Sequence, residues 1–149
     1  MQAIFGGAIA VVLLAIYLQL IRVAYLVVDC ATTAGCTTYP AGYFNDSMAQ
    51  ALAIVGGLVS ALVIAELAAT KPGDAPAARA LADDATARAK LILKLVSAVY
   101  ILAWMGAGLV AFFVGLFHPK ELPALTSLGQ AWLGLAVASA YAYFGINTR

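Results

Sequence analysis

Four long apolar segments constrain the fold of this chain more than any other feature of its sequence. They cover about residues 3–28, 48–69, 91–117 and 131–146. At about 1.5 Å per residue, helices of these lengths suit a hydrocarbon core roughly 30 Å thick. Only 10% of the 149 residues are charged, too few to cover the surface of a water-soluble domain. We therefore predict an all-α integral membrane protein, a single domain of four transmembrane helices in an up-down bundle.

The basic residues predict which way these helices cross the membrane. The loop at 70–90 holds four Lys or Arg residues, the loop at 29–47 holds none, and the loop at 118–130 holds one. Basic residues near helix ends favour the cytoplasmic side. We therefore expect both termini in the cytoplasm and the loops 29–47 and 118–130 outside. Residues 75–90 are rich in alanine with opposite charges four residues apart, which predicts a helical extension of the third span into the cytoplasm.

Two hydroxyl residues indicate where helices begin. Ser47 and Ser127 are each followed three residues later by glutamine, at Gln50 and Gln130. This spacing is typical of a capping box, in which the two side chains accept hydrogen bonds from the first backbone N–H groups of a helix. The pattern predicts that the second and fourth helices start at these serines.

Both cysteines, Cys30 and Cys36, fall in the first outer loop. An oxidising compartment permits a disulfide there, and Ala34 and Gly35 between them can turn the chain back. A redox-active pair is the alternative interpretation. A membrane oxidoreductase that forms disulfides needs further cysteines to relay electrons, and the chain has only these two. We therefore expect a structural disulfide that closes a small loop.

Small residues recur at every fourth position in three of the segments. In lipid, burying apolar side chains between helices gains little, so helices associate by close packing, which small residues allow. The pattern favours a tight bundle and, more weakly, contacts between copies. Its alternative is chance, because the whole chain is rich in alanine and glycine. The predicted packing residues are Gly57, Ala61 and Ala65, then Ala103, Ala107 and Ala111, then Gly134 and Ala138.

Few polar residues lie inside the apolar segments, and these are the residues at which a functional site is expected in a membrane protein. They are Gln19, Arg22, Glu66 and Lys94. We expect Arg22 to reach outward or to pair with an acidic residue of an outer loop. Glu66 and Lys94 lie at similar depth on consecutive helices, which predicts an ion pair. The alternative is that these side chains line a pore or bind an anion.

Catalytic machinery is missing from the sequence. No acidic residue lies at mid-membrane to couple transport to an ion gradient. The one histidine, His118, cannot supply paired haem ligands, and no cluster of residues suits zinc or di-iron. We therefore expect no cofactor, no metal and no enzymatic activity. A net charge of +1 also argues against a nucleic-acid partner.

Three functions remain compatible with these features. The favoured one is a non-catalytic membrane protein that acts through assembly, as a homo-oligomer or as a small subunit of a larger membrane complex. Its partners would be the lipid bilayer and either itself or other membrane subunits. The alternative is a pore-forming or channel protein, of which a holin-like protein is one version. A small membrane carrier comes third, because its coupling groups are absent.

Overall fold

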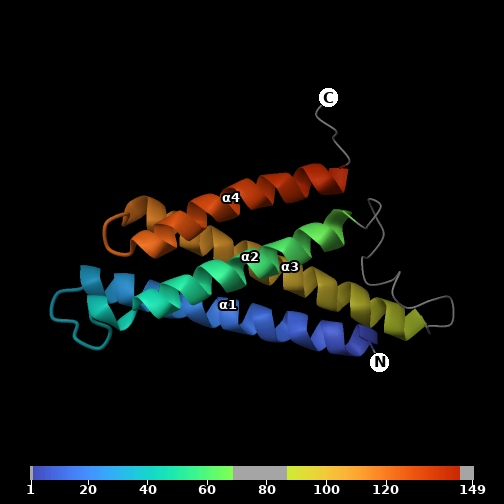
Figure 1. The fold of residues 1–149 in the computed structure, drawn as a ribbon, viewed down its shortest axis with the longest axis horizontal. Helices are drawn as coiled ribbons and strands as arrows, with labels where there is room; N and C mark the ends of the chain where they lie inside the picture. Colours follow the sequence, from blue (N-terminus) through green and yellow to red (C-terminus); the bar gives the residue numbers. More distant parts are fainter. Residues whose placement is uncertain (1, 69–86, 145–149) are drawn as a thin grey trace.

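A computed structural model describes residues 2–68 and 87–144, and within these ranges the chain is all-helical (Figure 1). The predicted fold class is therefore confirmed at the level of an all-α chain. A single turn of 3-10 helix, η1, follows the first long helix. The elements are α1 (Gln2–Thr32), η1 (Ala41–Tyr43), α2 (Asp46–Ala68), α3 (Ala87–Phe117) and α4 (Pro123–Phe144).

Three of the four long helices are long and apolar enough to cross a membrane. The candidate spans are Gly7–Thr32, Asp46–Ala68 and Lys94–Phe117. The 22-residue helix α4 is not among them. It carries Gln130 and two tyrosines near its end, Tyr141 and Tyr143, which lower its mean hydropathy. The structure thus supports a membrane protein with three such helices, and the fourth crossing stays a sequence-based expectation.

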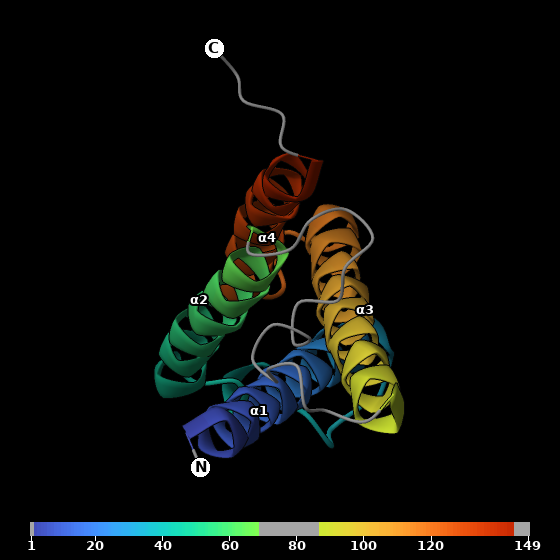
Figure 2. The same cartoon turned by 90° about the vertical axis from the view of Figure 1, so that its right-hand side faces the viewer.

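The four helices are arranged around the bundle in the order α1, α2, α4, α3, as the view along the bundle shows (Figure 2). The most extensive contacts join α3 to α4, and α2 to α4, while α1 contacts both α2 and α3. The helices α2 and α3 lie at opposite corners and hardly touch. The connections from α1 to α2 and from α3 to α4 lie at the same end of the molecule (Figure 1). Cys30 and Cys36 lie at this end, at the end of α1 and just after it, so we call it the disulfide end.

The starts of α2 and α4 differ from the prediction. The side-chain oxygen of Asn45 accepts a hydrogen bond from the backbone N–H of Met48 at 2.9 Å, so Asn45 caps α2 and Ser47 lies inside its first turn. Helix α4 begins at Pro123, well before Ser127. Proline has no N–H, and its fixed φ angle suits the first helical position, so it starts a helix without loss. Both serine starts were therefore wrong.

The predicted cytoplasmic extension at 75–90 falls mostly outside the described residues, which resume at 87. Residues 87–90 belong to α3 and continue directly into its apolar part.

Large side chains, rather than small ones, fill the centre of the bundle. The indole N–H of Trp104 on α3 donates to the hydroxyl of Ser60 on α2 at 3.0 Å, and both side chains are buried. The ring of Trp132 on α4 lies 5.8 Å from that of Trp104, centre to centre. This contact links three helices at the core. The largest fully buried side chains are Trp104, Tyr17, Leu52, Leu125, Val27, Val59 and Val63.

Candidate functional site

Glycines bring α3 and α4 into direct backbone contact. A methyl group added at Gly129 would lie 2.6 Å from the Cα atom of Phe112, which is closer than real side-chain atoms approach. One added at Gly115 would lie 2.7 Å from the Cα atom of Thr126. At Gly108 an added methyl would overlap the indole ring of Trp132. These glycines form what we call the α3–α4 seam, where close approach replaces large side chains.

Some of the predicted packing residues lie inside the bundle. Ala111 is fully buried on α3. Ala107 and Ala103, about one and two turns before it, are half-buried against the core. All three belong to α3, the helix that contacts α4 most extensively.

The other predicted packing residues face outward in the single chain. Gly57, Ala61 and Ala65 on α2 are exposed, as are Gly134 and Ala138 on α4. No heavy atom lies within 4 Å of a methyl group placed at Gly57 or Gly134. These five residues therefore do not pack between the helices that the structure describes. On α2, the exposed residues Ala53, Gly57, Ala61 and Ala65 form what we call the smooth face of α2.

Three glycines that lie between helices were not among the predicted packing residues. On α2 the buried glycine is Gly56, where an added methyl would lie 2.9 Å from the Cδ1 atom of Leu128. Gly108 and Gly129 were also missed. No sequence signal separates Gly56 from Gly57, because both lie in a helix that is apolar on every side.

A cleft of about 360 Å³ lies between α2 and α4, which are in contact beside it. Its walls are made mainly of small residues from the two helices. Tyr17 of α1, Ser60 and Trp132 line it from the core side. Among the described residues, no charged side chain lines this α2–α4 cleft. The small wall residues include Ala49, Ala53 and Gly57 from α2, and Ala124, Ser127 and Ala131 from α4.

The four polar residues of the apolar segments do not come together. Gln19 and Arg22 are exposed on α1, Lys94 is exposed on α3, and Glu66 is half-buried on α2. Among the described residues, no ion pair joins Glu66 to Lys94. The predicted pair is not formed because α2 and α3 lie at opposite corners of the bundle.

Arg22 likewise forms no ion pair with Asp46 or Glu121, the acidic outer-loop candidates, within the part of the chain that the structure describes. Together with the exposure of Gln19 and Lys94, this leaves these side chains on the outside of the single chain rather than around a shared channel.

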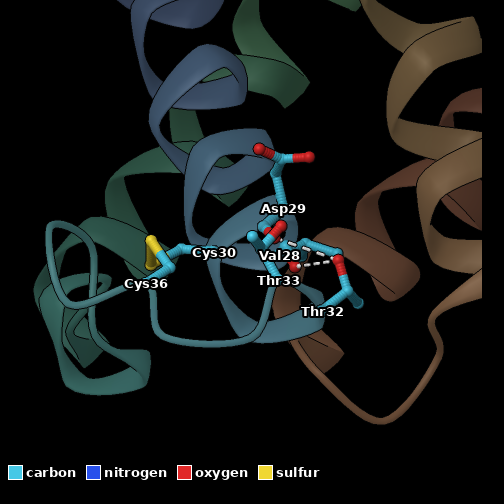
Figure 3. The surroundings of a disulfide bond; sticks show 6 residues. All are labelled: Val28, Asp29, Cys30, Thr32, Thr33 and Cys36. Carbon is cyan, nitrogen blue, oxygen red and sulfur yellow. Dashed lines mark hydrogen bonds between the residues drawn. A yellow bond between two sulfur atoms is a disulfide. The ribbon is translucent and has the colours of Figure 1, made fainter.

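The structure joins Cys30 to Cys36, with Cα atoms 5.2 Å apart (Figure 3). Cys30 is buried in the last turn of α1, and Gly35 turns the chain back with a φ of +79°, a conformation that glycine adopts freely. The hydroxyl of Thr33 donates to the carbonyl of Asp29 at 2.8 Å and that of Thr32 to the same carbonyl at 3.0 Å. These bonds satisfy a carbonyl at the end of α1, which otherwise has no helical partner.

One buried polar atom lacks a hydrogen bond in the described part of the chain. It is the indole nitrogen of Trp132, whose edge lies over Gly108 in the α3–α4 seam. Within residues 2–68 and 87–144, no three His, Cys, Asp or Glu side chains come close enough to hold a metal ion. The geometry thus offers packing surfaces and an apolar cleft.

No protein-family model, curated protein or solved structure matches this chain.

Proposed function

We propose that this chain is a non-catalytic membrane protein that acts through assembly, as a homo-oligomer or as a small subunit of a larger membrane complex. The observation that carries the proposal is the smooth face of α2. Its residues Ala53, Gly57, Ala61 and Ala65 are exposed in the single chain, so no other described helix covers them, although Ala53 and Gly57 also border the α2–α4 cleft.

The physical reason lies in how helices associate in lipid. Lipid tails are as apolar as leucine, so helices gain from contact mainly through van der Waals packing. A face without large side chains lets a neighbouring backbone approach closely, and weak Cα–H contacts to carbonyls then become accessible. The smooth face of α2 offers a narrow strip of this kind along most of the apolar helix, flanked by the exposed side chains of Ile54, Leu58 and Leu62. A helix from a second copy or from another subunit is its natural partner.

We also propose that all four helices cross the membrane as one domain, with both termini in the cytoplasm. The loop 29–47 and the connection 118–122 would then lie outside, and residues 75–90 would extend α3 into the cytoplasm. The predicted outer loop 118–130 is shortened, because residues 123–130 belong to α4 and lie beside the apolar end of α3. The α3–α4 seam supports the fourth crossing. Because Gly115 and Gly129 keep α4 in backbone contact with α3, the two helices lie at similar depth. The basic residues of the 70–90 loop support the orientation.

The number of chains in a mild-detergent complex tests the assembly proposal. Native mass spectrometry of the wild-type protein is expected to show more than one copy or a co-purifying subunit. Ala61→Leu places a large side chain on the smooth face, so the complex should dissociate to single chains. The matched control is Leu102→Ala, which changes an exposed residue of α3 and should leave the complex intact.

A wild-type protein that purifies as a single chain with no partner would contradict the proposal. Liposomes provide the comparison with a pore. An assembly subunit leaves a trapped dye inside the vesicles, whereas dye release that depends on the protein would support a pore-forming function instead.

A further inference from the structure

We infer that the hollow between the last turns of α1 and α3 is a binding site for an organic ammonium group, carried by a lipid headgroup or by a free small amine. The hollow measures about 170 Å³ and lies at the disulfide end (Figure 1). Below it is called the α1–α3 pocket. The inference requires neither assembly nor a fourth crossing. The polar and aromatic lining residues are Tyr25, Asp29, Thr32, Phe113, Phe117 and His118.

The position of the pocket along the helices corresponds to the depth of lipid headgroups. The candidate spans Gly7–Thr32 and Lys94–Phe117 both end at it. A bilayer is roughly 30 Å thick in its hydrocarbon core and about 40 to 45 Å thick with its polar headgroup regions, so the end of a span borders the headgroups. A ligand can therefore reach the pocket from water or as part of a lipid headgroup.

The electrostatics of the α1–α3 pocket favour a cation. Both α1 and α3 end at it, and the last turn of a helix carries the equivalent of about half a negative charge on its unpaired carbonyls. Neither helix has a basic residue in its last turn to offset this charge. Asp29 adds a carboxylate, which is unfavourable near the end of a helix unless a cation compensates it. Among the described residues, no lysine or arginine lines the pocket.

The carboxylate of Asp29 can contact such a cation directly. Within the part of the chain that the structure describes, it forms no ion pair and no hydrogen bond. The hydroxyls of Thr32 and Thr33 donate to the backbone carbonyl of Asp29 instead. The carboxylate points away from both hydroxyls (Figure 3). Because Asp29 is exposed, a ligand reaches it without any movement of the helices.

The aromatic rings favour an organic ammonium group over a metal ion. Phe113 and Phe117 are stacked, with ring centres 6.3 Å apart and planes 12° apart, and Tyr25 lines the pocket from α1. The faces of such rings attract ammonium groups, including quaternary ones. A metal ion such as Ca²⁺ takes about six to eight oxygen ligands, which aromatic rings do not supply. In the described ranges, no three His, Cys, Asp or Glu side chains come together to supply them.

Saturation-transfer NMR with choline tests the inference for a free amine. The full chain is held in an uncharged, deuterated detergent, its aromatic protons are saturated, and the methyl protons of choline are observed during a titration at constant ionic strength. We expect transfer to these methyl protons. Asp29→Asn removes the charge and Phe117→Leu removes one ring, so each should raise the dissociation constant about two- to fivefold.

Two matched controls make the same changes outside the pocket. Asp46→Asn alters an exposed carboxylate at the same end of the molecule, on α2. Phe144→Leu alters an exposed ring at the end of α4. Both should bind choline as the wild type does. Circular dichroism checks that each variant keeps its helices.

Native mass spectrometry tests whether the ammonium group belongs to a lipid. The full chain is extracted from vesicles with equal amounts of phosphatidylcholine and phosphatidylglycerol, of which only the first carries an ammonium group. If the source is a headgroup, the wild type retains phosphatidylcholine in preference, and Asp29→Asn loses the preference while Asp46→Asn keeps it. Choline binding without a lipid preference would identify a free amine as the source.

Two results would overturn the inference. One is the absence of both choline binding and a lipid preference, or equal values for both in Asp29→Asn and Asp46→Asn. The other is a loss in Asp29→Asn with no change in Phe117→Leu, which would leave a simple contact between charges that the rings do not select. The assembly proposal fails separately, because Ala61→Leu tests it through the number of copies and lies on α2, outside the α1–α3 pocket.

Discussion

At the scale of single residues, the central feature is the hydrogen bond from Trp104 to Ser60. Its two side chains are 1% and 3% exposed, and the nitrogen and oxygen lie 3.0 Å apart. Inside a bilayer no water can replace a lost partner, so an unpaired indole N–H stays unsatisfied. The bond also joins α2 to α3, which otherwise hardly touch. This polar contact therefore holds α2 and α3 together across the centre of the bundle.

A double-mutant cycle on this pair measures the contribution of the bond. Ser60→Ala, Trp104→Phe and the double variant are each unfolded from mixed micelles with a denaturing detergent. The coupling between the two substitutions in the free energy of unfolding is expected to be about 1 kcal/mol, in the range measured for hydrogen bonds between membrane helices. A coupling near zero would show that the bond contributes nothing to stability.

At the scale of helices, the α3–α4 seam is the closest contact in the described part of the chain. Gly129 and Gly115 face backbone atoms of the other helix, which cannot move aside as a flexible side chain can. The connection between α3 and α4 is also short, from His118 to Leu122. The two helices thus form a hairpin whose close packing depends on glycines, which carry no side chain.

Two glycines of α4 separate close packing from helix propensity. Gly129→Ala places a methyl group against Phe112 and should lower the free energy of unfolding by about 1–3 kcal/mol, the usual cost of overpacking. Gly134→Ala makes the same change where no atom lies within 4 Å and should be neutral or stabilising by up to about 1 kcal/mol. Detergent unfolding of both variants checks the difference. Equal effects at the two sites would contradict the seam.

The sequence predicted the helices well but not the faces by which they pack. Apolar length located α1, α2 and α3, because the cost of exposing a peptide group to lipid decides where a helix lies. It could not distinguish Gly56 from Gly57. Neighbouring residues point about 100° apart on a helix, and an all-apolar helix has no polar side to reveal its orientation. The start of α4 was misplaced because Ser127 was preferred over Pro123.

At the scale of the whole molecule, the spatial order of the helices explains two features that the sequence did not predict. The predicted pair of Glu66 with Lys94 assumed that consecutive helices are neighbours. In the structure α2 and α3 lie at opposite corners of the bundle, and α1 and α4 occupy the two corners between them (Figure 2). The α2–α4 cleft has the same origin, because it lies between helices that are distant in sequence. The distance of Glu66 from Lys94 and the α2–α4 cleft both follow from the tertiary arrangement of the helices, which the local sequence pattern does not specify.

Cysteine labelling tests the orientation of the whole chain. Single cysteines are introduced at Gly42, Arg88 and Thr148, and intact cells are treated with a maleimide that cannot cross the membrane. We expect Gly42→Cys to react at once, and Arg88→Cys and Thr148→Cys only after the membrane is opened. The native pair is joined and should not react. Reaction of Thr148→Cys in intact cells would contradict the fourth crossing.

The position of the bond between Cys30 and Cys36 has a consequence for how the protein withstands changing conditions. The two cysteines are only six residues apart, and both lie at the end of a single helix. The bond therefore ties no helix to another, and a loop this short restrains the unfolded chain less than a long one would. Reducing agents should loosen the turn after α1 and leave the bundle standing. The redox conditions of the compartment should thus affect the structure of one surface turn and leave the packing of the helix bundle unchanged.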